Sequence, residues 1–257
     1  MREVLEKMKR LANIIMLSMV LLLAVLAASS PAAPEDILKR WSKSETYKND
    51  MGSELEITAT YYSAEYIEAL VQTEAEKNLW TKDEMENYKY ELLKSLQMDE
   101  YIPVHIEFNN LGPALRMAPF DRQIWMWIGS EKFSPADYDK RFNFKVSDKR
   151  DGLVFFPRYD EKGNSLIEGV KSVKLSLRGI ISPVTTRFST IDFIWDVYKD
   201  DPSRLWSGDA AAKLEIDRLI KRVEKLQVQK AELEAQLSEV NGELAQINAR
   251  IEELRSE

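Results

Sequence analysis

The chain contains no cysteine and only one histidine, and each scarcity excludes a kind of chemistry. Without cysteine there is no disulfide, no thiolate nucleophile and no cysteine-ligated zinc site. With His105 alone, a histidine metal cluster and an HExxH zinc motif are excluded as well. A Ser-His-Asp triad would have to use His105, and no nucleophile motif lies near it. Because His105 falls on the polar side of a predicted strand, we expect a hydrogen-bonded surface residue.

The short motifs of several enzyme families are missing too. The sequence has no GxSxG, Ser-x-x-Lys, GxGxxG or P-loop pattern. Glycoside hydrolysis needs only two carboxylates, but the 43 acidic residues mark no particular pair. A net charge of −7, with no basic stripe interleaved with aromatic residues, argues against nucleic-acid binding. These absences favour a protein that is not an enzyme, and no motif indicates a metal ion or a cofactor.

The N-terminal stretch 1–29 has the pattern of an export signal. Four basic residues within 1–10 precede residues 11–28, which carry no charge and end in small side chains. Such a pattern is typical of a bacterial secretory signal peptide, here cleaved after Ala27 or Ser29. The alternative is a retained membrane anchor, since eighteen residues lie at the lower limit for spanning a bilayer. Either way, we expect export to the periplasm or cell surface, with membrane contact only through the uncleaved segment.

The hydrophobic pattern predicts a mainly β domain at 51–198, after a spacer at 30–50 that holds a brief helix. Apolar and polar residues alternate with a period of two, as in strands buried on one face. The predicted strands are 55–61, 102–108, 124–128, 142–146, 153–156, 173–177 and 191–197. A helical hairpin is predicted within 64–98, where a capping box at Thr81 starts the second helix. Seven alternating strands favour an immunoglobulin-like β-sandwich with this hairpin inserted.

Trp125 and Trp127 share one face of the predicted strand 124–128, whose other face is also apolar. Two indole rings on a sheet can form a stacking platform for a sugar or a peptide. The competing interpretation is core packing, with both faces of this strand buried, one of them beneath an element such as the helical hairpin. The sequence leaves both interpretations open.

The strongest pattern lies at the C-terminus, in residues 209–257, after a linker at 199–208. Two positions repeat every seven residues, offset by three, over six heptads, and all but Lys230 are apolar. We call these twelve positions the seam: Ile216, Leu219, Val223, Leu226, Lys230, Leu233, Leu237, Val240, Leu244, Ile247, Ile251 and Leu254. A helix that lies on a globular core keeps a 3.6-residue period, so this strict 3.5-residue spacing predicts a coiled coil.

Three features of this coiled coil remain open from the sequence. Asn241-Gly242 could form a turn between two helices, although the heptads pass through it in phase. The helix could instead fold back on its own domain. Residues 213–230 contain six basic and three acidic residues, whereas 231–257 contain two basic and seven acidic. Such opposed halves suit an antiparallel pair, or an acidic end that meets a basic partner.

Together these patterns predict an exported, non-enzymatic envelope protein. We expect it to self-assemble, or to dock another envelope protein, through the C-terminal coiled coil. The β-sandwich would then serve as a recognition or scaffold domain, and several copies would raise avidity. The alternative is a carbohydrate-binding or glycan-cleaving envelope protein that uses Trp125 and Trp127.

Overall fold

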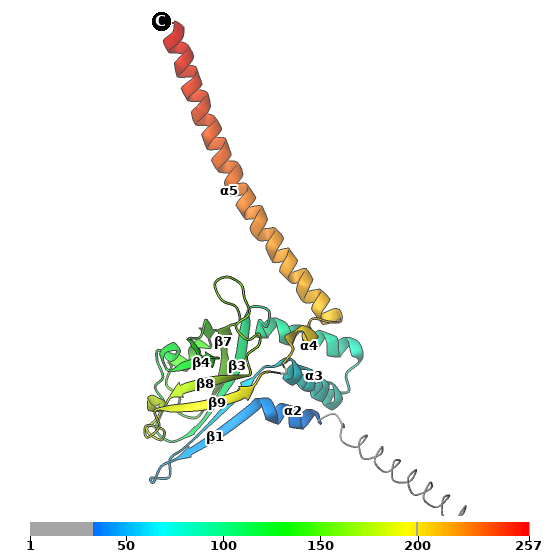
Figure 1. Ribbon diagram of the computed structural model, residues 1–257, viewed down its shortest axis with the longest axis vertical. Coiled ribbons are helices and arrows are strands. Elements are labelled where there is room, and N and C mark those ends of the chain that lie inside the picture. Colours follow the sequence, from blue (N-terminus) through cyan, green and yellow to red (C-terminus); the bar gives the residue numbers. More distant parts are fainter. Residues whose placement is uncertain (1–32, 199, 257) are drawn as a thin grey trace, which may run out of the picture.

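The computed structural model describes residues 33–198 and 200–256, and shows a mixed α/β body from which one long helix projects (Figure 1). Two antiparallel sheets build the body. The larger sheet has the strand order β1-β2-β3-β7-β6, and the smaller has the order β5-β4-β8-β9. The strands are β1 (Ser42–Lys48), β2 (Glu54–Tyr61), β3 (Tyr101–Leu111), β4 (Ile124–Ile128), β5 (Glu131–Phe133), β6 (Asp137–Tyr138), β7 (Lys149–Pro157), β8 (Ser172–Arg178) and β9 (Thr190–Asp196).

The helices precede, interrupt and follow the sheets. They are α2 (Pro34–Trp41), α3 (Ala64–Asn78), α4 (Lys82–Leu96) and α5 (Asp209–Ser256), with short 3-10 turns η1 (Phe120–Arg122), η2 (Lys140–Asn143), η3 (Gly179–Ile181) and η4 (Pro202–Leu205). Within the described ranges, no helix combines the length and the apolar character needed to cross a membrane. The signal peptide or anchor expected at 1–29 lies outside the described residues.

The main core lies between the two sheets and is built by the alternation seen in the sequence. In β2, for example, Leu55 and Ile57 are fully buried while Glu54 and Glu56 are half-buried. Strands β3, β8 and β9 bury their core-facing residues in the same way, while β4 also buries Trp125 on its other face. Since each strand turns its apolar face toward the other sheet, the period of two predicts the inner face of each strand correctly.

The margins of the two sheets lie close together. On one side, only residues 134–136 separate β5 of the smaller sheet from β6 of the larger. On the other, the Lys43 side chain of β1 donates a hydrogen bond to the carbonyl oxygen of Ile194 in β9. The indole of Trp195 donates to the carbonyl of Trp41, at the junction of α2 and β1, over 2.9 Å. These contacts occupy backbone groups that an open strand edge would expose.

The structure differs from the predicted strand at 142–146. This segment instead holds the end of η2 and an irregular stretch, in which Phe142 and Val146 are buried and Phe144 is exposed. Asp139 caps η2 by accepting a hydrogen bond from the backbone N–H of Arg141. An aspartate that bonds the backbone two residues on stabilises a turn against an extended strand. The apolar alternation of this segment therefore does not form one buried strand face, and the cap made by Asp139 favours the turn.

The expected brief helix within 36–49 is also different in extent. Helix α2 ends at Trp41, and most of the rest of the segment is strand β1. The sheets contain nine strands and not the seven expected, because β1, β5 and β6 were not predicted and the strand expected at 142–146 is absent. Most side chains of β1 are exposed, and the strand is held by antiparallel pairing with β2 along its length. A polar strand at a sheet edge carries no hydrophobic alternation, which is why the pattern did not reveal it.

The predicted helical hairpin is present as α3 and α4. Ser63 caps α3, and Thr81 and Glu84 form the capping box that starts α4. The two helices bury a second, smaller apolar cluster together with η4, and Leu214 of α5 packs against it. Its buried members are Ala64, Ile67, Val71, Leu93, Leu96, Met98 and Leu205. This cluster fixes where α5 leaves the body.

Candidate assembly surface

The first turns of α5 are bound to α4 by a compact set of polar contacts. Ala210 is buried, and its backbone N–H donates to Glu86 over 3.1 Å. The Tyr90 hydroxyl donates to Asp217 over 2.5 Å, and Lys94 lies 3.1 Å from the same carboxylate. The hydrogen bond from Tyr90, together with Lys94, lowers the pKa of Asp217. The base of α5 is therefore oriented by charge-assisted hydrogen bonds as well as by apolar packing.

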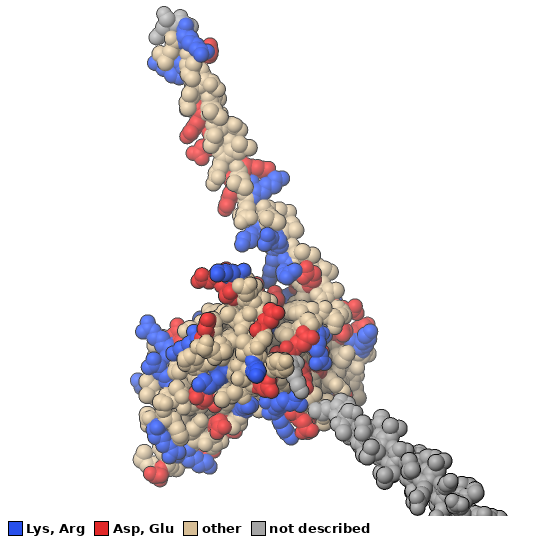
Figure 2. Space-filling view, in the orientation of Figure 1, with Lys and Arg blue, Asp and Glu red and all other residues tan. Residues whose placement is uncertain are grey.

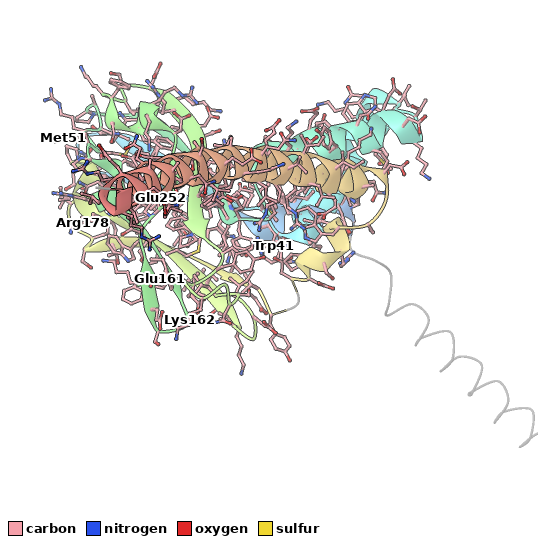
Figure 3. The ribbon with its side chains drawn as sticks, turned by 90° about the horizontal axis from the view of Figure 1, so that it is seen from above. Trp41, Met51, Glu161, Lys162, Arg178 and Glu252 are labelled. Atoms are coloured by element: carbon pink, nitrogen blue, oxygen red, sulfur yellow. The ribbon has the colours of Figure 1, made fainter. Side chains whose placement is uncertain are left out.

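Beyond this base, α5 extends away from the body. Every residue from 218 to 255 is exposed, and Figure 3 shows Glu252 near the far end of the helix while Trp41 lies in the body. The apolar seam residues are each between 42 and 64 % exposed. A space-filling view shows uncharged surface running along α5 between its charged groups (Figure 2). An isolated helix that exposes so continuous an apolar stripe is typical of an interaction surface.

The seam and the body-facing side of α5 lie on nearly opposite faces. Ala210, Leu214 and Asp217 face the body, and each residue turns the helix by about 100°. Leu219 therefore points roughly half a turn away from these three, and Ile216 about a third of a turn away. Docking of α5 on α4 thus leaves the seam free from its first residue, and a second helix could lie along it without displacing the body.

The helix passes through Asn241 and Gly242 without a break, so the alternative of a turn there is not what the structure shows. Gly242 sits on the face opposite the seam, and a Cβ added to it would meet nothing within 4 Å. At Lys230 the seam is marked by a shallow hollow of about 320 Å³, lined by Leu226, Leu233 and Leu237 among others. The ammonium group of Lys230 lies 3.6 Å from Glu234, one turn further along the helix.

The proposed platform of Trp125 and Trp127 lies on the outward face of β4. Trp125 is only 9 % exposed, and the ammonium group of Lys132 sits 3.9 Å from its ring centroid. Lys174 lies 5.6 Å from the ring of Trp127, which is less deeply buried. These are cation–π geometries, so a sugar could stack on Trp125 only after Lys132 had moved. The face is therefore partly occupied by the chain itself.

His105 forms a pair with Asp151 on the neighbouring strand β7. Its Nε2 lies 3.1 Å from a carboxylate oxygen, and the pair lines a cleft of about 480 Å³ that also contains Asp139 and Arg141. Arg141 bonds Asp139 with its guanidinium group and lowers the pKa of that carboxyl. In the described part of the chain, no three His, Asp or Glu side chains are grouped so that they could hold a metal ion. The histidine is hydrogen-bonded and partly exposed.

Two cavities, of about 590 and 650 Å³, are both lined by Arg158 and Trp206, and the smaller one borders the base of α5. Arg158 is only 5 % exposed and donates from Nε to the carbonyl of Tyr101 over 3.1 Å. Asp200, which lines the larger cavity, accepts a hydrogen bond from the N–H of Ala64 at the start of α3. Burial raises the pKa of Asp200 to about 6. Sequence reasoning missed this region, and placed Asp200 in a plain linker.

Comparison with protein-family models, with curated proteins and with solved structures finds no match to this chain.

Proposed function

We propose that this chain is an exported, non-enzymatic envelope protein that self-associates by forming a coiled coil through α5. The single observation that carries the proposal is the seam, which remains exposed over its whole length on the face turned away from the body. We further propose that the paired sheets form a sandwich of immunoglobulin-like kind that serves as a recognition or scaffold domain. Export rests on the sequence pattern of residues 1–29.

The energetics favour a paired helix. Burying a fully exposed Leu, Ile or Val side chain stabilises a protein by about 1.5–3 kcal/mol, and pairing can gain about half of this for each seam residue because these side chains are only about half exposed. Eleven such side chains on each helix lie in the seam, whereas association costs roughly 4–15 kcal/mol in lost translational and rotational freedom. Lys230 subtracts from this sum, but a single polar seam residue is a recognised means of limiting oligomer size and fixing register.

The test compares two equally exposed apolar residues of α5. Leu233 lies in the seam and is 64 % exposed, while Val228 lies on the outer face and is 60 % exposed. Light scattering of the chain from residue 30 onward should report an oligomer for the unmodified protein and for Val228→Glu, and a monomer for Leu233→Glu. If the unmodified protein is monomeric at micromolar concentration, self-association is wrong, and α5 must be tested against other envelope proteins.

The alternative function, carbohydrate binding or cleavage through Trp125 and Trp127, is supported by the outward position of both rings. It is weakened by the lysines that already lie over them. A glycan array probed with the unmodified protein and with Trp127→Ala tests it. A ligand whose binding is lost on substitution would establish a carbohydrate site, and a blank array would remove it.

A further inference from the structure

We propose that α5 pairs antiparallel with α5 of a second copy, in the register that sets Val223 opposite Val240 of that copy. This inference rests on the proposed self-association and adds its direction and register. It follows from the distribution of charge beside the seam, and from the way the body holds the base of the helix.

Charge decides first between the two directions. Val223 is the first of the two seam positions in its heptad. In a parallel pair, the residue just before such a first position faces the residue five places further along the other helix. Applied to this chain, that rule sets Arg250 against Arg255 and gives no pair of opposite charge among the other flanking positions. In an antiparallel pair, the basic half 213–230 lies along the acidic half 231–257 of the second copy. Complementary charge of this kind selects orientation.

Charge then decides between antiparallel registers. If Ile216 lay opposite Leu254, Arg222 would face Arg250, and Glu234 would face itself across the two-fold axis. A shift of one heptad sets Ile216 opposite Ile247 and Val223 opposite Val240. In that register Arg222 faces Glu243 and Glu215 faces Arg250, and the two-fold axis produces each attractive pair twice.

Two of these four side chains are unpaired in the single chain, whereas Glu215 and Arg250 already form ion pairs with Arg218 and Glu253 of their own helix. Neither Arg222 nor Glu243 has an ion-pair partner among the described residues, although both flank the seam. Two exposed, unpaired groups of opposite sign, 21 residues apart on one helix, cannot reach each other within the chain. An antiparallel second copy brings each to the other without rearranging the helix.

The base of α5 has room for the end of the second helix. In the proposed register, Ile251 of the second copy falls opposite Ala212, a small and exposed residue in line with the seam. Ala212 and its neighbour Ala211 line the 590 Å³ cavity, together with Trp206. The incoming end therefore meets an open space that is lined by charged groups such as Arg218 as well as by apolar side chains. The paired stretch therefore extends over nearly the whole helix.

The absence of cysteine permits a direct test by disulfide mapping in an otherwise unmodified chain. Two cysteines link only when their Cα atoms lie within about 7 Å. In the proposed dimer, Val223 of one copy lies roughly 25 Å from Val223 of the other, since 17 residues separate it from Val240. The single variant Val223→Cys should therefore stay unlinked under oxidation, whereas the double variant Val223→Cys/Val240→Cys should link 223 to 240 between copies.

Each other outcome overturns a defined part of the proposal. Linkage of Val223→Cys to itself would show a parallel pair. Linkage in Val223→Cys/Ile247→Cys, and not in the 223/240 variant, would show an antiparallel pair in the rejected register. A dimer that links in none of the three variants overturns both direction and register. A monomer by light scattering overturns the proposed self-association itself, so the two failures are distinguishable.

A charge exchange provides an independent readout. Arg222→Glu creates two repulsive contacts per dimer and should weaken association about tenfold, while Arg222→Glu/Glu243→Arg should restore it to within about threefold. Lys225→Glu makes the same change of charge on the outer face and serves as the matched control, with association expected within about threefold of the unmodified protein. If the double exchange fails to restore association, the proposed contact between these two residues is wrong.

Discussion

Tyr90 of α4 donates a hydrogen bond to Asp217 of α5, and this contact across 127 residues of sequence fixes the direction in which the long helix leaves the body. The same carboxylate accepts Lys94 as an ion-pair partner. Both contacts lie on the side of α5 opposite the seam. Because these polar contacts hold α5 by the side opposite the seam, the seam stays free for a second helix.

We predict that Asp217→Asn loosens the base of α5 without unfolding the body. Loss of the carboxylate removes the ion pair with Lys94, so amide hydrogen exchange of residues 210–217 should become faster while the sheets remain protected. Glu224→Gln, one heptad further along and free of the body, is the control and should leave exchange at 210–217 unchanged. Equal exchange in all three proteins would show that the Asp217 carboxylate does not hold the base.

The same contact has a defined pH dependence. The pKa of Asp217 is lower in the folded chain than its ordinary value of 3.8, so the folded state favours the ionised form. The stabilising contribution of the ionised Asp217 carboxylate is therefore fully present above pH 3.8. It is lost as the pH falls through the lowered pKa of the folded chain. Exchange at 210–217 in the unmodified protein should approach that of Asp217→Asn only in this acidic range.

The stability that Asp200 contributes should change with pH in the opposite direction. Burial raises its pKa from 3.8 to about 6, so the folded chain binds a proton more tightly than the unfolded chain. Stability contributed by the protonated form should fall as the pH rises from about 4 to above 6, by roughly 2–3 kcal/mol. We expect the difference in unfolding free energy between the unmodified protein and Asp200→Asn to change by this amount over that range. Asp201→Asn, with an exposed carboxylate, should show no such change.

Gly242→Ala should stabilise α5 by about 0.5–1 kcal/mol, because glycine is a poor helix former and the position is open. Helicity measured by circular dichroism should rise, and the association constant should not fall, since position 242 faces away from the seam. Gly179→Ala is the contrasting change. A Cβ there would overlap the backbone of Phe188, so this variant should lose about 2–3 kcal/mol of stability.

The sequence predicts best where a side-chain period is repeated and the partner is local. The alternation in 102–108 and 173–177 predicted both strands, and the Thr81 capping box predicted the start of α4 correctly. The strict heptads predicted one long helix, and the turn that the sequence left open at Asn241-Gly242 does not form. In each case the signal lies within a few residues of the structure that it specifies.

The sequence predicts least where tertiary contacts decide. Strand β1 is polar and exists through its pairing with β2, and η2 depends on the cap made by Asp139. The approach of Asp200 to the start of α3 joins residues 136 positions apart, and no local period records such a contact. The position of the seam on the free side of α5 likewise depends on the docking of α5 against α4, which only the folded structure shows.

The last prediction concerns Lys230, the one polar residue of the seam. A lysine at this position must move its charge out of the apolar interface or remain near an acidic group such as Glu234. Lys230→Leu should therefore strengthen association by about tenfold or more and should favour additional, larger oligomers, because a polar seam residue limits oligomer size. Sedimentation velocity of the unmodified protein, of Lys230→Leu and of Lys225→Leu on the outer face measures both effects. If Lys225→Leu strengthened association as much as Lys230→Leu, added hydrophobicity alone would explain the result, and Lys230 would have no special role in the interface.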